Sequence, residues 1–333
     1  MRNFSGDATS TFANSGRSSA LRFIVLIGVV SLFSDMTYEG ARSITGPYLA
    51  VLGASGAAVR LVAGSGELIG YGLRLVSGYL ADRTGRYWTL TILGYVVNLL
   101  AVPLLALTGR WETAAALMIA ERVGKAVRSP ARDAMLSHAT KEVGHGWGFG
   151  LHEALDQIGA VLGPLAVAAV LAYDAGDYRT GFAVLLISAL LALSVLAAAR
   201  WRFPSPRDFE PQTVKSETGS FPRRFWIFLS AVALVAAGYA DFPLIAYHLG
   251  KQGVVPPDWI PVFYAVAMAV DAVAAMVFGR WFDRLGVPVL ALSSLLSAGF
   301  APLVFLGGFG PALALWASAW EPRSRSCGRP SPG

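Results

Sequence analysis

The sequence has few charged residues: Asp, Glu, Lys and Arg together make up 14% of its 333 residues, whereas a soluble domain has about 25%. Apolar residues make up 55%, and the mean hydropathy is +0.54. This composition excludes an ordinary soluble domain and predicts a protein embedded in a lipid bilayer. The net charge of +6 indicates no nucleic-acid partner, because most basic residues lie in loops between apolar runs rather than in one patch.

Cysteine and catalytic motifs are also scarce. The single cysteine, Cys327, excludes an internal disulfide and a cysteine-based metal cluster. The sequence contains no nucleotide-binding loop, no HExxH motif and no GxSxG motif, so neither ATP-driven transport nor hydrolysis has support. We therefore expect no cofactor, no metal and no enzymatic activity. No cleavable signal peptide is evident, because the first apolar run is too long for one.

Long apolar runs take up most of the chain. Most of them are close to the ~20 residues that a helix needs to cross a ~30 Å hydrocarbon layer. Backbone polar groups in lipid must be paired within the segment, so each run is predicted to be an α-helix and the fold class is all-α. The predicted spans are Phe23–Ala50, Val59–Leu80, Trp88–Thr108, Thr113–Arg132, Gly148–Ala172, Thr180–Ala199, Phe225–Leu249, Trp259–Phe278 and Val287–Leu306, with a tenth from Phe309 to about Trp320.

The loops predict the orientation and the domains. With the N-terminus inside, most loop arginines and lysines fall on the cytoplasmic side, as the positive-inside bias requires. We expect a multi-pass protein of the inner or plasma membrane, acting as a monomer. The predicted domains are a cytoplasmic tail (1–22), a six-helix bundle (23–199), a cytoplasmic linker (200–224), a partial second bundle of three to four helices (225–320) and a polar tail (321–333).

A short charged segment recurs in both halves. The first copy runs from Gly78 through Asp82, Arg83 and Gly85 to Arg86, and Gly85 suits a tight turn because glycine accepts positive φ. The second copy follows the eighth span and contains Gly279, Asp283, Arg284 and Gly286 at the same spacing. Any polytopic protein could carry one basic inside loop with a glycine. Equivalent placement of two copies indicates an internal repeat.

The first copy resembles the loop 2–3 signature of the major facilitator superfamily, with Tyr87 where the family usually has lysine. The resemblance implies two six-helix bundles that rock about a midplane site, a solute driven by an ion gradient, and the two charged segments as conformational gates. After Trp320 the sequence departs from the twelve-helix pattern. We hypothesise a truncated or frameshifted gene. A natural short tail is the alternative, and the DNA beyond this codon would distinguish them.

Charged residues within the spans are the candidates for function, because they are costly in lipid and usually face a cavity or a partner. In the first span, Asp35, Glu39 and Arg42 share one helical face. In the fourth span, Glu121, Arg122 and Lys125 lie deepest. A Glu39–Arg42 pair and a Glu121–Lys125 pair are the structural alternatives. Even with the first of these pairs formed, Asp35 has no local partner.

The remaining candidates lie in later spans. Asp156 shares a face with His152, but no third metal ligand is visible at a suitable spacing. Gly159-x-x-x-Gly163-Pro164 resembles the start of the superfamily's antiporter motif and favours efflux, although a Gly-Pro kink is also a common structural device. The other two candidates, Asp241 and Asp271, are carboxylates at mid-span with no local basic partner.

We therefore expect a secondary transporter of a small solute, coupled to protons through Asp35, Glu39, Glu121 or Asp156. A carboxylate whose protonation changes the favoured conformation could couple solute movement to proton movement. The alternatives are a non-functional transporter fragment and, with less support, a membrane-embedded enzyme or receptor. The sequence does not identify the solute.

Overall fold

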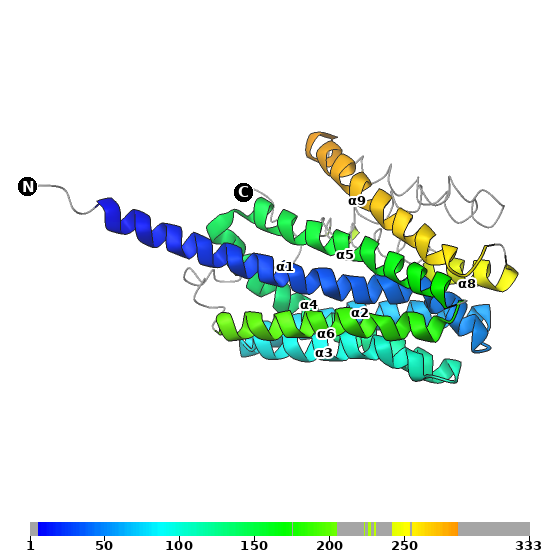
Figure 1. Cartoon of the computed structure of the whole chain (residues 1–333). Helices are drawn as coiled ribbons and strands as arrows, with labels where there is room; N and C mark the ends of the chain where they lie inside the picture. Colours follow the sequence, from blue (N-terminus) through cyan, green and yellow to red (C-terminus); the bar gives the residue numbers. More distant parts are fainter. Residues whose placement is uncertain are drawn as a thin grey trace, which may run out of the picture.

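The computed structural model describes residues 6–174, 176–204, 242–253 and 255–285, together with residues 223, 226, 227 and 230. These ranges contain α-helices, one 3₁₀ turn and short connections, which confirms the predicted all-α fold (Figure 1). The helices are α1 (Gly6–Val51), α2 (Gly56–Thr84), α3 (Tyr87–Leu104), α4 (Trp111–Val143), α5 (His145–Tyr173), α6 (Tyr178–Arg202), α8 (Phe242–Gln252) and α9 (Trp259–Leu285), with the 3₁₀ turn η1 at Leu105–Leu107. The predicted spans from Val287 onward lie outside the described residues.

Several helices extend beyond the predicted spans. α1 begins at Gly6 rather than Phe23, and α4 continues to Val143 rather than ending at Arg132. Good helix formers such as Ala, Met, Leu, Lys and Glu prolong α4 beyond its apolar run, whereas the residues that extend α1 are mostly weak helix formers. The apolar run marks only the part of a helix that lies in hydrocarbon. For the same reason the two charged segments begin inside helices: Asp82 lies in the last turn of α2, and Asp283 lies in the last turn of α9.

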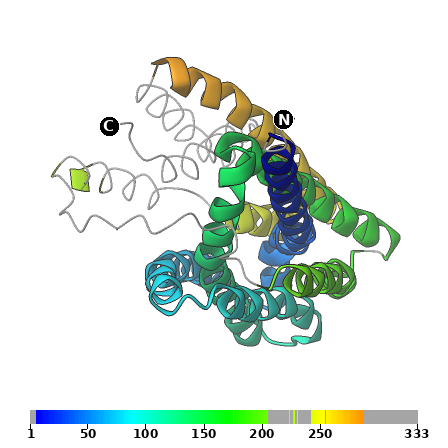
Figure 2. The same cartoon turned by 90° about the vertical axis from the view of Figure 1, so that its left-hand side faces the viewer.

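Helix α1 is the central element of the bundle. It packs against α4, α5, α6 and α8, and the end-on view in Figure 2 shows it enclosed by the other helices. The approach to α5 is close because Gly159 and Gly163 face the α1 backbone at Leu32 and Met36, where a Cβ atom would come within 3 Å. Small residues permit such packing within membranes.

Apolar clusters occupy both ends of the α1–α6 bundle. One joins the first turns of the α1 span to α3, α4 and α6, and includes Phe23, Trp88 and Leu136. The other joins the far end of α1 to α2, α5 and α6, and includes Ile44 and Phe182. A layer of polar and charged side chains lies between these two clusters, and the candidate site is built from it.

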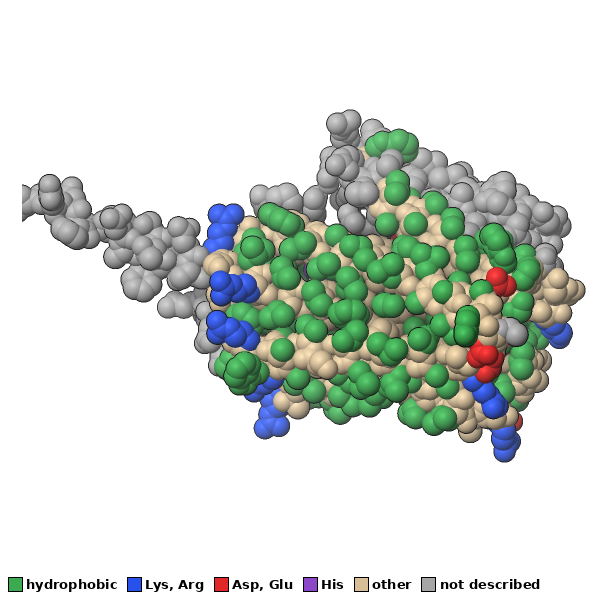
Figure 3. Space-filling model, in the orientation of Figure 1, with side chains coloured by type: hydrophobic (Ala, Val, Ile, Leu, Met, Phe, Trp, Pro, Cys, Tyr) green, Lys and Arg blue, Asp and Glu red, His purple; other side chains and the backbone are tan. Residues whose placement is uncertain are grey.

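The outer surface is apolar over most of the bundle. Figure 3 shows apolar side chains across one whole face, with charged side chains confined to its two ends. Within the described residues, four helical segments are long and apolar enough to cross a membrane: Arg17–Val51, Tyr87–Leu107, Gly146–Tyr173 and Tyr178–Arg202. α2 and α4 fall short because they carry the polar residues of the central layer.

Candidate functional site

One face of α1 carries the polar layer. Polar residues recur on this helix every three or four positions, a spacing that aligns them along one side. They are Ser31, Asp35, Tyr38, Glu39, Arg42 and Thr45. All six are buried or half-buried, so the face points into the protein and not toward lipid. The predicted common face of Asp35, Glu39 and Arg42 is therefore present.

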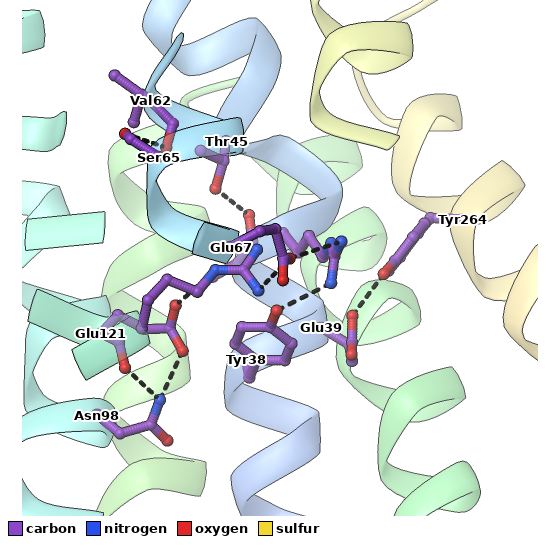
Figure 4. A network of polar contacts seen from close by, with 12 residues as sticks. Tyr38, Glu39, Thr45, Val62, Ser65, Glu67, Asn98, Glu121 and Tyr264 are labelled. Carbon is purple, nitrogen blue, oxygen red and sulfur yellow. Dashed lines mark hydrogen bonds and ion pairs between the residues drawn. The ribbon is translucent and has the colours of Figure 1, made fainter. Parts of the chain in front are cut away.

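Arg42, Glu67 and Arg122 join α1, α2 and α4 in the centre of the layer. Figure 4 shows Glu67 there, beside Tyr38 and Glu121. The Arg122 guanidinium lies 2.6 Å from the Glu67 carboxylate, and the Arg42 guanidinium approaches the same oxygen at 3.7 Å. Arg42 also donates a hydrogen bond of 2.9 Å to the Tyr38 hydroxyl. One carboxylate from α2 thus contacts two guanidinium groups, one from α1 and one from α4.

Glu121 extends this network to α3. Its carboxylate accepts a 2.6 Å hydrogen bond from the Asn98 side-chain amide and lies 3.5 Å from the Arg122 guanidinium. The backbones of α3 and α4 are close here because Gly124 faces Asn98 and Gly94 faces Arg128. A Cβ atom on either glycine would come within 3 Å of the opposite backbone. These two glycines bring the Asn98 amide within reach of Glu121.

The Lys125 ammonium packs against an aromatic ring and not against a carboxylate. Its ammonium lies 3.6 Å from the centroid of the Tyr38 ring, a cation–π arrangement. Arg122 lies over the same ring at 5.2 Å. The sequence left open a Glu121–Lys125 pair, whereas the structure places Glu121 on Asn98 and Arg122. Within the described part of the chain, no carboxylate lies within 4 Å of the Lys125 ammonium.

Asp35 forms the centre of a second group, one turn away along α1. Arg128 of α4 lies 3.9 Å from its carboxylate, and the Arg128 side chain is almost fully buried (1% exposed) beside the Tyr95 ring. Asp156 of α5 lies near enough to Asp35 for the two carboxylates to repel each other electrostatically. Arg132, which donates to Ser31 at 3.1 Å, acts electrostatically on both Asp156 and Asp35.

Glu39 links the bundle to α9. The Tyr264 hydroxyl donates a 2.5 Å hydrogen bond to its carboxylate (Figure 4). Tyr264 is buried, as is Asp271 two turns further along α9. Asp241 lies outside the described residues. The charged face of α1 is thus connected to α9 as well as to α2, α3 and α4.

The candidate gate residues lie at one end of the bundle. Gly85 adopts a left-handed conformation (φ 62°), and its N–H donates to the Ala81 carbonyl, which ends α2. Gly78 faces Pro130 of α4, whereas Asp82, Arg83 and Arg86 are exposed. Of the second copy, the structure describes Gly279, Asp283 and Arg284 as helical backbone, and Gly286 lies outside the described residues.

Sequence reasoning missed five residues that complete the site: Tyr38, Glu67, Asn98, Arg128 and Tyr264. Glu67 and Arg128 were visible as charges in apolar spans, but only tertiary packing shows that they face Arg122 and Asp35. Asn98 is a polar residue in the middle of an otherwise apolar helix, a signal that could have identified it. The tyrosines give no such signal, because aromatic residues are common in membrane spans. No group of His, Cys, Asp and Glu in the described part of the chain is arranged to hold a metal.

Comparisons with known proteins agree with this architecture. A family model described as "Major Facilitator Superfamily" matches residues 24–320. An uncharacterised protein of Mycobacterium tuberculosis (strain H37Rv) is 46% identical over 285 residues, covering 84% of this chain and 70% of the relative. An uncharacterised MFS-type transporter of Methanocaldococcus jannaschii is 25% identical over 273 residues, covering 79% of this chain and 67% of that one.

Solved transporter structures share the fold. A mutant of the nucleoside transporter NupG superimposes with a TM-score of 0.64 at 12% identity, over 90% of this chain and 80% of that chain. A bacterial homologue of the human lysosomal transporter Spinster, inward-facing and unoccupied, superimposes with a TM-score of 0.65 at 15% identity, over 91% and 74% of the two chains. At these identities the likeness concerns the fold alone.

Proposed function

Because the chain belongs to the Major Facilitator Superfamily and is a membrane protein of the secondary-transporter class, we propose that it moves a small polar solute by exchange with protons. The observation that supports this most directly is the buried charged layer between two apolar clusters. Ionisable groups are costly at membrane depth and persist there where they bind a solute or relay an ion. We further propose that the N-terminus faces the cytoplasm and that the chain acts as a monomer in the inner membrane.

The solute site is proposed to lie around Tyr38. Arg42 and Arg122 share the Glu67 carboxylate, and Glu121 lies 3.5 Å from Arg122, so two carboxylates offset these two guanidinium charges. Lys125 is held over the Tyr38 ring at 3.6 Å, with its positive charge balanced by no ion pair within the described ranges. The carboxylates of Asp35, Glu39 and Glu121 act on Lys125 electrostatically without forming an ion pair, and an anionic group on the solute would form that close pair. We accordingly expect solutes with a carboxylate or a similar anionic group to be preferred over their neutral analogues.

The proton site is proposed to be Asp35, with Asp156 as the second carboxylate. Asp35 lies 3.9 Å from a deeply buried arginine. Protonation of Asp35 would remove the carboxylate that is paired with Arg128 and weaken the compensation of a buried charge, which is unfavourable. A conformation that exposes Arg128 or gives it another partner would then gain population. Proton binding and the position of α4 would be coupled in this way.

Export is the proposed direction. Gly159 and Gly163 of α5 hold that helix against α1 near Asp35 and Asp156, and Pro164 follows within the same helix. This arrangement fits the resemblance of the segment to an antiporter motif. A purely structural role for the glycines would give the same packing, so the direction has to be measured by flux.

The test uses the full chain in proteoliposomes that contain a pH-sensitive dye. A panel of carboxylates, amino acids, nucleosides and sugars is applied, and proton movement that depends on an added solute is recorded. We expect Asp35→Asn to abolish this movement while leaving solute–solute counterflow measurable. Asp174→Asn is the matched control, because Asp174 is exposed at the end of α5 and lies outside the central layer. Undiminished proton movement in Asp35→Asn would refute the assignment, and failure of the wild-type chain to move any solute would refute the function.

A further inference from the structure

One cavity lies away from the charged layer. It is a groove of about 560 Å³ between α3 and α6, on the outer side of the bundle. Its lining includes Ile92, Val96, Leu193, Leu196, Arg200 and Trp201. All but Arg200 are apolar or aromatic side chains, and none belongs to the proposed solute or proton site. The groove therefore needs a separate explanation.

The groove runs along the helices and ends at the membrane boundary. Leu193 and Arg200 are two turns apart on α6, a rise of about 10 Å. α6 ends at Arg202, so Arg200 and Trp201 lie where the apolar span gives way to polar chain. Trp201 is 86% exposed, and tryptophan favours the level of the lipid headgroups. One end of the groove is therefore in hydrocarbon, and the other is at the headgroup layer.

The headgroup end is basic and held in place by specific contacts. The Arg200 guanidinium donates to the Pro204 carbonyl and lies 5.8 Å from the centroid of the Trp88 ring. Trp88 in turn donates a 3.0 Å hydrogen bond to the Phe203 carbonyl, which fixes the start of α3 to the end of α6. A guanidinium has five N–H donors, and only one of them is used by the Pro204 bond. The remaining donors suit a phosphate group.

From these observations we propose that the groove binds one anionic phospholipid. An acyl chain lies between α3 and α6 against Ile92, Val96 and Leu193, and the phosphate pairs with Arg200. A zwitterionic lipid fills the same groove less well, because its own cation competes for the phosphate and is repelled by Arg200. The surrounding charge is of the complementary sign: Arg86 and Arg202 lie at this same end and are exposed. Basic pockets between membrane helices are a known kind of anionic-lipid site.

The test compares lipids that differ only in the headgroup. The full chain is purified in a mild detergent, and its thermal unfolding and its retained lipid are measured with dioleoyl-phosphatidylglycerol, dioleoyl-phosphatidylcholine or sodium phosphate. We expect phosphatidylglycerol to raise the unfolding midpoint and to remain bound in native mass spectra. Arg200→Gln should weaken its binding about fivefold, the effect of one basic residue at a membrane surface.

Two further variants make the assignment specific. Arg202→Gln removes the same charge from the same helix end but does not line the groove, so it should retain most of the binding. Ala197→Phe fills the groove while leaving Arg200 in place, and it should reduce lipid retention even if Arg200→Gln folds poorly. Equal losses in Arg200→Gln and Arg202→Gln, equal binding of both lipids, or full stabilisation by phosphate alone would each overturn the proposal.

Discussion

Helices α4 and α6 cross the same bundle but have opposite characters. α6 contains the most apolar window of the described chain, with a mean hydropathy of 2.7, and its charges lie only at its ends. α4 contains no window of comparable hydropathy and carries Glu121, Arg122, Lys125 and Arg128 in its middle. By hydropathy α4 is therefore a weaker membrane span than α6, although the sequence predicted one at Thr113–Arg132.

The difference shows how the bundle tolerates charge. The charged side chains of α4 face α1, α2 and α3. Arg128 pairs with Asp35, Arg122 pairs with Glu67, and Glu121 accepts a hydrogen bond from Asn98. Leu186, Ile187 and Leu190 of α6 face outward and are 41–63% exposed. A charged residue within a membrane span is therefore acceptable only where a partner lies within reach. Removing a charge from α4 and adding a charge to α6 should therefore both destabilise the bundle.

The largest expected effect follows from removing one charge of α4 and leaving its partner. Arg122→Gln removes the guanidinium that lies 2.6 Å from Glu67 and 3.5 Å from Glu121, and leaves Glu67 only its longer 3.7 Å contact with Arg42. Breaking a buried ion pair in this way typically costs about 3–5 kcal/mol. We expect a much lower unfolding midpoint in detergent, measured by fluorescence, together with loss of transport.

The double variant Glu67→Gln/Arg122→Gln is the matched control for this effect. It removes one charge of each sign and should recover part of the lost stability, because the net charge of the network of Arg42, Glu67, Glu121 and Arg122 is then the same as in the wild-type chain. Transport should stay lost in the double variant if the pair serves the solute site. A double variant as unstable as Arg122→Gln alone would show that the pair is not coupled, and α4 would then need another explanation.

The second prediction puts a charge where α6 has none. Leu190 lies at the middle of α6 and is 50% exposed on the lipid side. Leu190→Lys should cost roughly 2.5–3.5 kcal/mol at the membrane centre, seen as reduced membrane insertion and lower stability. Tyr173→Lys is the control, since Tyr173 is exposed at the end of α5, where a lysine reaches water. Equal behaviour of the two lysines would contradict the lipid-facing placement of α6.

The sequence was sufficient to predict the apolar helices and the shared face of Asp35, Glu39 and Arg42, because both follow from local periodicity. It also predicted the left-handed turn at Gly85, which the structure confirms with a φ of 62°. The helix ends were less accurate: α2 includes Asp82, and α9 includes Asp283. An apolar run reports the thickness of the hydrocarbon layer and not the length of the helix.

The partners of the charged residues could not be predicted from the sequence. Glu121 had a plausible partner one turn away in Lys125, yet it bonds to Asn98, which is 23 residues distant along the chain. The reason is the close approach of α3 and α4 at Gly94 and Gly124. This approach results from tertiary packing, and no local sequence pattern indicates it. The Glu39–Tyr264 contact spans 225 residues and depends on how α9 packs. The roles of these residues in coupling and gating remain predictions.

The smallest expected effect concerns the glycine that makes the α4 network possible. Gly124→Ala would place a Cβ atom 2.8 Å from the Asn98 Cα and force α3 and α4 apart. Overpacking of this kind typically costs about 1–3 kcal/mol, and the Asn98–Glu121 bond should lengthen with it. Gly64→Ala in α2 is the control, because no described atom lies within 4 Å of the added carbon, and alanine favours the helix by about 0.5–1 kcal/mol. We expect thermal unfolding to show a loss for Gly124→Ala and none for Gly64→Ala. A neutral Gly124→Ala would mean that α3 and α4 can separate freely, and the charged layer would then be held by its ion pairs and not by the close approach of these two helices.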